Sequence, residues 1–210
     1  MDTLQCIAER RSIKSYDPQH RLSESELRQL LSAAALAPTS FNMQNRHFVA
    51  LVNPDAKAEL MPAAFGQEQV RDASVVVVIT GDLQAYANTE RYLRDAPAEL
   101  RTTFEGMSRQ FYEGKPELQR DEACRSVGLA GMNLMLAAKA MGYDSCPMIG
   151  FDPAKVSDVL GLDADHPPLM IVTIGKATKP AWPRLGLLTM DELVSIDRFG
   201  NHSLCGEVAE

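Results

Sequence analysis

The sequence predicts an α+β protein in which helices pack on a β-sheet. Apolar runs of five or six residues, typical of buried strands, occur in the same chain as longer segments with helical periodicity. The two kinds of segment are mixed without the regular strand–helix–strand spacing of a doubly wound parallel sheet. The 210 residues, 45% of them hydrophobic, contain no repeat, low-complexity tract or linker. We therefore expect one domain over residues 1–210.

The N-terminal half is predicted to alternate helices and strands. A capping box at Ser23–Glu26, followed by leucines at helical spacing, predicts a helix that Pro38 ends. The polar loop after this proline leads to a predicted strand at 47–52 and to a helix that begins at Pro54. Residues 75–79 are all β-branched and apolar, which predicts a strand buried on both faces.

The C-terminal half is predicted to be mainly helical. Residues 84–118 have helical character with interruptions at Pro97 and around Pro116. The longest helix is predicted at 121–141, because its second half is apolar on nearly every side and Gly142 ends it.

Two further strands are predicted after this helix, at 143–148 and 169–174. Between them, residues 153–160 predict a short helix that Gly161 closes. Residues 176–210 are polar and rich in proline, so we expect a weakly structured C-terminal extension.

Charge and composition exclude several classes of function. The net charge of −7 and the pI of about 5.2 disfavour binding to nucleic acid or to acidic membranes. No apolar run approaches a membrane span, and the N-terminus does not resemble a signal peptide, so we expect a cytoplasmic protein. The spacing of Cys6, Cys124, Cys146 and Cys205 predicts reduced thiols and no metal site.

The segment Arg10-Arg11-Ser12-Ile13-Lys14 is the most informative one for function. Three cations and a hydroxyl within five residues can bind an anion such as a phosphate. Because the chain as a whole is negatively charged, this local positive cluster favours a specific anionic ligand over a generally basic surface. A solvated helix end, where cations favour the C-terminal dipole, explains the same residues. The cluster alone does not separate these two interpretations.

Four sequence blocks, in this order, resemble the FMN-dependent nitroreductase family. They are RRSIKSYD at 10–17, LAPTSFNMQNRHF at 36–48, DASVVVVITGD at 72–82 and PMIGFDP at 147–153, with a weaker fifth block, GKATKPAWPR, at 175–184. The resemblance implies a three-layer sandwich with a central, mostly antiparallel sheet flanked by helices. It also implies an interlocked homodimer with two FMN sites at its interface.

The resemblance assigns roles to the cationic residues. Arg10 would bind the FMN phosphate, while Ser12 and Arg11 would bind phosphate or ribityl oxygens. Arg184, in the weaker block, would also reach the phosphate. Lys14 would lie near N1 and O2 of the flavin, where its positive charge would raise the reduction potential.

Two other segments would surround the flavin ring. In the loop Pro147-Met148-Ile149-Gly150, the N–H groups of Ile149 and Gly150 would face N5 and O4. The residues that the resemblance places against the ring from the other subunit are Pro38, Thr39, Ser40 and Asn42. Neither a catalytic side chain nor a metal is implied, since the flavin N5 carries the hydride.

Some positions depart from the family pattern. Asn45-Arg46 stand where many relatives carry Pro-Trp, and Gln67 and Gln69 stand where some relatives place Asn and Lys on the flavin. The two glutamines would therefore only donate or accept hydrogen bonds there. The resemblance implies that the 84–118 region forms a variable helical lid over the flavin. Its pocket residues would be Phe104, Met107, Phe111 and Tyr112, although ordinary packing explains the same spacing.

The predicted function is an oxidoreductase that uses NADH or NADPH to reduce nitroaromatics or quinones through FMN. Donor and acceptor would share one site, which implies ping-pong kinetics. Two alternatives stay open. One is another flavin enzyme on this fold, such as a dehalogenating, flavin-destroying or azole-oxidising enzyme. The other is a non-catalytic flavin-binding protein.

Overall fold

The structure is a computed structural model that describes residues 1–201 and divides the chain into two units, Met1–Pro180 and Ala181–Glu210. The last part of the predicted C-terminal extension, with Cys205, lies outside the described residues. The second unit contains one helix in its described part, α9 (Met190–Leu193), which begins with a capping box between Thr189 and Glu192. Within residues 1–201, every helix is too short or too polar to cross a membrane.

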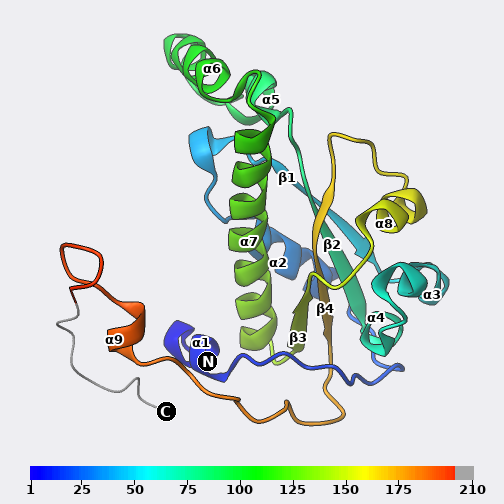
Figure 1. Ribbon diagram of the computed structural model, residues 1–210. Coiled ribbons are helices and arrows are strands. Elements are labelled where there is room, and N and C mark those ends of the chain that lie inside the picture. The colour runs from blue at the N-terminus through cyan, green and yellow to red at the C-terminus, as the bar shows by residue number, and fades with distance from the viewer. Residues whose placement is uncertain (202–210) are drawn as a thin grey trace. The chain divides into compact units, whose positions relative to one another are not determined.

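A four-stranded antiparallel sheet forms the centre of the first unit (Figure 1). Its strands are β1 (Arg46–Leu51), β2 (Val75–Gly81), β3 (Asp144–Met148) and β4 (Pro168–Gly175), in the spatial order β1-β2-β4-β3. Every residue of β2 is buried, as the β-branched sequence predicts for a central strand covered on both faces.

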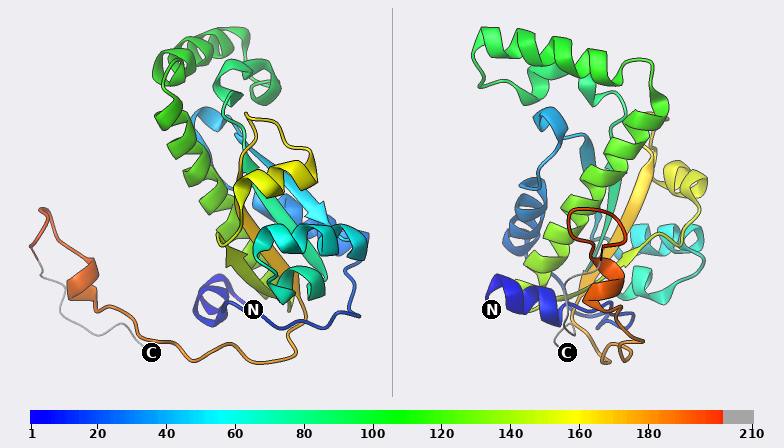
Figure 2. Two further views of the ribbon diagram at one scale, coloured as in Figure 1. Left: turned by 45° about the vertical axis from the view of Figure 1, so that its right-hand side comes forward. Right: turned by 60° about the vertical axis from the view of Figure 1, so that its left-hand side comes forward.

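Helices cover both faces of this sheet (Figure 2). On one face lie α2 (Glu24–Ala35) and the long α7 (Pro116–Ala140), with α1 (Thr3–Glu9) beside α7. On the other face lie α3 (Pro54–Leu60), α4 (Glu68–Asp72) and α8 (Pro153–Leu160). The α+β class and the three-layer arrangement are therefore confirmed.

The remaining elements lie near the N-terminal end of α7. They are the 3-10 turns η1 (Ser40–Asn42) and η3 (Ala85–Ala87), and the helices α5 (Thr89–Tyr92) and α6 (Ala98–Tyr112). A further 3-10 turn, η2 (Met61–Ala64), follows α3. The helical character predicted for 84–118 is confirmed. The predicted interruption at Pro97 is also present, because Pro97 is the N-cap residue of α6.

One predicted boundary was wrong by several residues, and one short helix was not predicted. The long helix begins at Pro116, five residues before its predicted start, because proline fits the first turn of a helix, where its missing N–H is not needed. The helix α4 was not predicted, since five residues are too few to carry a periodic signal. The predicted stop at Gly142 is confirmed, with a φ of 77° just after the helix.

Gly81 lets the end of β2 approach α7 closely. A Cβ added at Gly81 would lie 2.9 Å from the Cβ of Ala123 and 3.1 Å from Cδ1 of Leu169. We expect Gly81→Ala to lower the free energy of unfolding by about 1–3 kcal/mol through overpacking, measured by urea denaturation. Gly106→Ala on α6, where a Cβ meets nothing within 4 Å, is the control and should raise stability by about 0.5–1 kcal/mol. Equal stability of Gly81→Ala and wild type would contradict the close approach.

Candidate functional site

The predicted cationic cluster runs beside β3. After α1, Ser12 forms an isolated parallel bridge with Ser145, and the N–H of Ile13 donates to the carbonyl of Ser145 at 3.0 Å. Ile13 is buried, whereas Ser12 and Lys14 are exposed. Successive side chains point to opposite sides of an extended backbone. The side chains of Ser12 and Lys14 therefore lie on the same side of this segment, opposite the buried side chain of Ile13.

Arg10 carries an unsatisfied donor in this cluster. Its Nη1 atom is buried and has no hydrogen-bond partner within the part of the chain that the structure describes. Leaving a buried donor unpaired costs about 1–3 kcal/mol, more for a charged group, so such atoms call for an explanation. An anion that binds at this point would remove the cost.

Cys146 in β3 lies within the electrostatic reach of the same cations. Burial raises the pKa of its thiol, while the positive charges of Lys14 and Arg10 act in the opposite direction. Burial is the larger cause, so the thiol stays protonated and Cys146 is a packing residue. Cys6, Cys124 and Cys146 are all free thiols, as predicted.

The two glutamines meet the loop that follows β3. Gln67 donates from Nε2 to the carbonyl of Gly150 at 2.8 Å, and Gln69 donates from Nε2 to Oε1 of Gln67 at 2.9 Å. Gln69 also lies 3.8 Å from the sulfur of Met148. This chain of contacts fixes the loop after β3 against the start of α4.

The loop itself presents two uncommitted backbone donors. Among the described residues, no hydrogen bond takes the N–H of Ile149 or of Gly150 as donor. Both residues are exposed, and Ile149 is 82% exposed. We refer to the residues gathered around this strand as the β3 group: Arg10, Arg11, Ser12, Lys14, Gln67, Gln69, Pro147, Met148, Ile149 and Gly150.

The predicted ring-binding residues Pro38, Thr39, Ser40 and Asn42, here called the loop group, lie in a strained loop. Phe41, Asn42 and Gln44 have φ values of 52°, 56° and 48°. For residues other than glycine, this left-handed backbone costs about 1–3 kcal/mol each and persists only where the surroundings enforce it. Such strain is concentrated at functional sites.

Polar contacts hold this loop in place. The amide of Asn42 donates to the carbonyl of Tyr92 at 3.0 Å, and the N–H of Gln44 donates to Oγ1 of Thr39 at 2.9 Å. The hydroxyl of Tyr112 donates to Oγ of Ser40 at 2.9 Å. The loop group is therefore bound to α5 and α6 of its own chain.

The cationic segment at 10–14 and the loop group lie near opposite ends of α7 (Figure 1). The loop group precedes Met43, which shares a small cavity with Glu122 near the start of α7. Ser12 of the cationic segment bridges Ser145 in the first part of β3, which follows the other end of the helix at Ala140. From Glu122 to Ala140 the helix rises about 27 Å at roughly 1.5 Å per residue. One chain therefore holds the cationic segment and the loop group at separate ends of this helix.

Arg184 lies in the second unit, in a segment before α9 that is neither helix nor strand. Its predicted role at a phosphate stays a prediction. Residues 1–201 contain no cluster of three or more His, Cys, Asp or Glu side chains suited to a metal ion.

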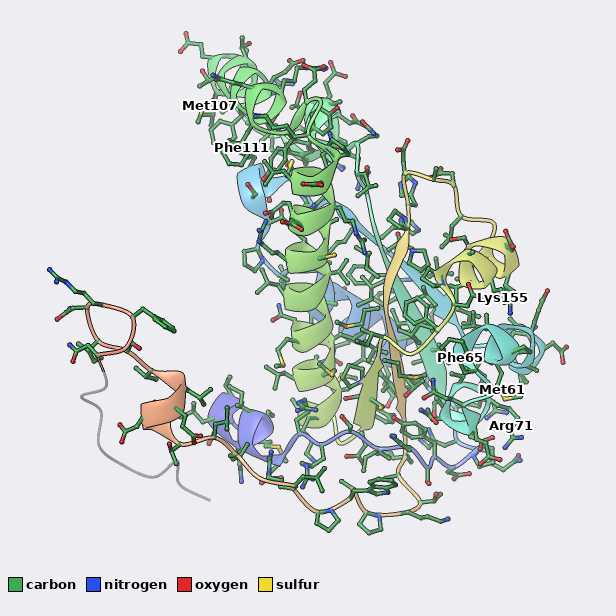
Figure 3. The ribbon with its side chains drawn as sticks, viewed as in Figure 1. Met61, Phe65, Arg71, Met107, Phe111 and Lys155 are labelled. Atoms are coloured by element: carbon green, nitrogen blue, oxygen red, sulfur yellow. The ribbon has the colours of Figure 1, made fainter. Side chains whose placement is uncertain are left out.

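The predicted lid residues divide into two kinds. Met107 and Phe111 are 48% and 51% exposed, and both side chains lie on α6 (Figure 3). Tyr112 is 2% exposed, and Phe104 packs edge-on against Phe41. Ordinary packing thus accounts for Tyr112 and Phe104, whereas Met107 and Phe111 are left available at the surface.

Arg46 supports the loop group, and the sequence did not predict this role. Its Nη2 atom donates to the carbonyls of Ala35 and Ala37, each at 2.7 Å, and so binds the C-terminal end of α2 just before Pro38. Burial lowers the pKa of the guanidinium. The only signal in the sequence was the departure at Asn45-Arg46 from the pattern of many relatives.

Comparison with known proteins identifies the relatives of this chain. A profile described as the nitroreductase family matches residues 7–176. Protein DrgA of Synechocystis is 48% identical over 182 residues, which cover 86% of this chain and 87% of that protein. The oxygen-insensitive NADPH nitroreductase of Helicobacter acinonychis is 29% identical over 185 residues, 84% of this chain and 88% of that protein.

Solved structures agree with this assignment. A crystal structure of an Exiguobacterium sibiricum protein in complex with FMN superimposes with a TM-score of 0.82 at 30% identity, covering 93% of this chain and 97% of that one. Because the profile covers most of the chain and the first relative is closely similar over nearly its whole length, the chain belongs to the nitroreductase family.

Proposed function

We propose that this protein is an FMN-dependent oxidoreductase that uses NADH or NADPH to reduce nitroaromatic or quinone acceptors, and that it works as a homodimer. The family, the NADPH nitroreductase among its relatives and the FMN-bound neighbour support this function. The observation that carries it is the buried, unpartnered Nη1 of Arg10 beside the exposed Ser12 and Lys14.

The residues present fit FMN. The phosphate of FMN needs cations and hydrogen-bond donors, and Arg10, Ser12 and Arg11 supply them on one segment. Burial makes the Arg10 contact strong, because a charged hydrogen bond gains strength where water is excluded. Arg184 is a further phosphate ligand in this proposal.

The other half of the β3 group suits the flavin ring. Lys14 would supply a positive charge at the pyrimidine edge, where it would stabilise negative charge on the ring. The N–H groups of Ile149 and Gly150 would bind the ring at N5 and O4, while the Gly150 carbonyl is held by Gln67. FMN, when bound, supplies the hydride chemistry itself.

A second copy of the chain completes the site. The loop group lies at the opposite end of α7 from the cationic segment at 10–14, so in this proposal Pro38, Thr39, Ser40 and Asn42 reach the flavin from the partner subunit. The exposed Leu129 and Met132 on α7 supply apolar surface for such an interface, at 47% and 44% exposed. The protein is thus a dimer with two sites, each built from both chains.

The two alternatives make different predictions. A non-catalytic flavin-binding protein would retain FMN without oxidising NADH or NADPH. Another flavin enzyme of this fold would bind FMN but leave quinones and nitroaromatics unreduced.

Cofactor release and steady-state kinetics test the function. The purified protein should carry about one non-covalent FMN per chain, identified by chromatography after acid release. With NADH or NADPH and 1,4-benzoquinone or nitrobenzene, double-reciprocal plots should be parallel, because donor and acceptor occupy the same pocket in turn. FAD, or no flavin after reconstitution, would overturn the proposal, and intersecting lines would overturn the shared pocket.

A further inference from the structure

Tyr112 connects the variable helical region to the loop group. It is the last residue of α6 and only 2% exposed. Its hydroxyl donates to Oγ of Ser40 at 2.9 Å, and its ring lies edge-on to Phe41 with the centroids 6.1 Å apart. The ring centroid of Tyr86 lies 6.3 Å from that of Tyr112, with the two rings tilted by 36°. One buried side chain therefore contacts two successive residues of the strained loop.

The strained backbone of the loop requires such support. Phe41 and Asn42 both have left-handed φ values, which most side chains disfavour. Asn42 is bound to the carbonyl of Tyr92 in α5, and the ring of Phe41 lies between Tyr112 and Phe104 of α6. The contacts that enforce the loop conformation thus come from the region predicted to vary between relatives.

The hydrogen bond from Tyr112 also determines whether the Ser40 hydroxyl acts as a donor or an acceptor toward other groups. The contact geometry makes the Tyr112 hydroxyl the donor, and burial raises the pKa of Tyr112, so the phenol keeps the proton that it donates. A serine hydroxyl has one proton and two lone pairs. Since Ser40 accepts from Tyr112, its own proton is left to donate to another group, and Ser40 is only partly buried.

We propose that Tyr112 is a positioning residue that holds Ser40 as a hydrogen-bond donor for an oxygen of the electron acceptor. Helix α6 would then influence the choice of acceptor in two ways: through Tyr112, which positions Ser40, and through the exposed side chains of Met107 and Phe111. Nitro groups and quinone carbonyls both offer the oxygen that such a donor recognises. This inference rests on the proposed function.

Tyr112→Phe tests the inference, because it removes the hydroxyl and keeps the ring. The value of kcat/KM for 1,4-benzoquinone should fall about fivefold, as expected for the loss of one neutral hydrogen bond. Reduction of ferricyanide, which takes an electron without a hydrogen bond from Ser40, should not change. Adding Tyr112→Phe to Ser40→Ala should lower kcat/KM for 1,4-benzoquinone little further than Ser40→Ala alone, since the two hydroxyls act as one unit.

A second measurement needs neither FMN nor turnover. In the FMN-free protein, amide hydrogen exchange of residues 40–44 should become faster in Tyr112→Phe. Tyr86→Phe is the matched control, because it removes a hydroxyl from the same aromatic cluster and has no hydrogen bond to Ser40 among the described residues. Tyr86→Phe should leave the amide exchange of residues 40–44 unchanged. The ratio of 1,4-benzoquinone reduction to ferricyanide reduction should also stay as in wild type.

The outcomes separate this inference from the proposed function. If wild type binds FMN and reduces quinone, but Tyr112→Phe matches it in exchange and in kinetics, the positioning role is refuted. An equal loss with quinone and ferricyanide would also refute it, since that pattern indicates general damage. A wild-type protein without FMN or quinone turnover would refute the proposed function, and the exchange experiment would still decide whether Tyr112 holds the loop.

Discussion

Replacing Arg10 with alanine should weaken FMN binding at least about tenfold. In the proposed site the buried Nη1 of Arg10 would donate a charged hydrogen bond to the phosphate, and the loss of such a bond costs about 1.5–3 kcal/mol. This cost corresponds to a rise in Kd of roughly 10- to 150-fold. Fluorescence titration of the FMN-free protein measures it directly.

Arg28→Ala provides the control for this experiment. Arg28 lies on α2, forms an exposed ion pair with Glu24 at 2.9 Å, and has a side chain that is 75% exposed. Removing it should leave FMN affinity unchanged, because exposed pairs contribute little to stability and this one is not part of the β3 group. Unchanged affinity in Arg10→Ala as well would mean that the cationic cluster is a solvated helix end.

Mixing two inactive variants should restore activity. Arg10→Glu reverses the charge at the phosphate, and Asn42→Pro cannot adopt the φ of 56° that the loop requires. Each variant alone makes dimers with two defective sites. In a mixed dimer, one site carries both defects and the other carries neither. After random exchange at equal amounts, about a quarter of the wild-type activity should appear, as a two-fold symmetric dimer requires.

A mixture with both changes in the same group is the control. Lys14→Glu lies in the β3 group with Arg10, so every site of a mixed Arg10→Glu and Lys14→Glu dimer keeps one defect. This mixture should stay inactive. Subunit exchange is checked with a tagged chain. Exchange without recovery in the first mixture would show that the loop group and the β3 group do not meet across subunits.

The sequence by itself determined those elements that depend only on residues close together in the chain. The all-β-branched run of β2, the capping box of α2 and the stop at Gly142 depend on residues a few positions apart. The alternation of Arg10, Ser12 and Lys14 is also local, since extended backbone sends such residues to one side. Local patterns of this kind were sufficient to predict the fold class and to single out the cationic segment as a candidate anion site.

Other features depend on contacts between distant residues, and only the tertiary structure decided them. Tyr112 meets Ser40 across 72 positions, and Gln67 meets Gly150 across 83. Arg46 has no local reason to be buried, and it is buried because the end of α2 offers it two carbonyls. Likewise, the separation of the loop group from the cationic segment at 10–14 follows from the length of α7, which lies between them. Local sequence sets backbone preference and chemistry, whereas burial and the pairing of distant polar groups arise only when the whole chain packs.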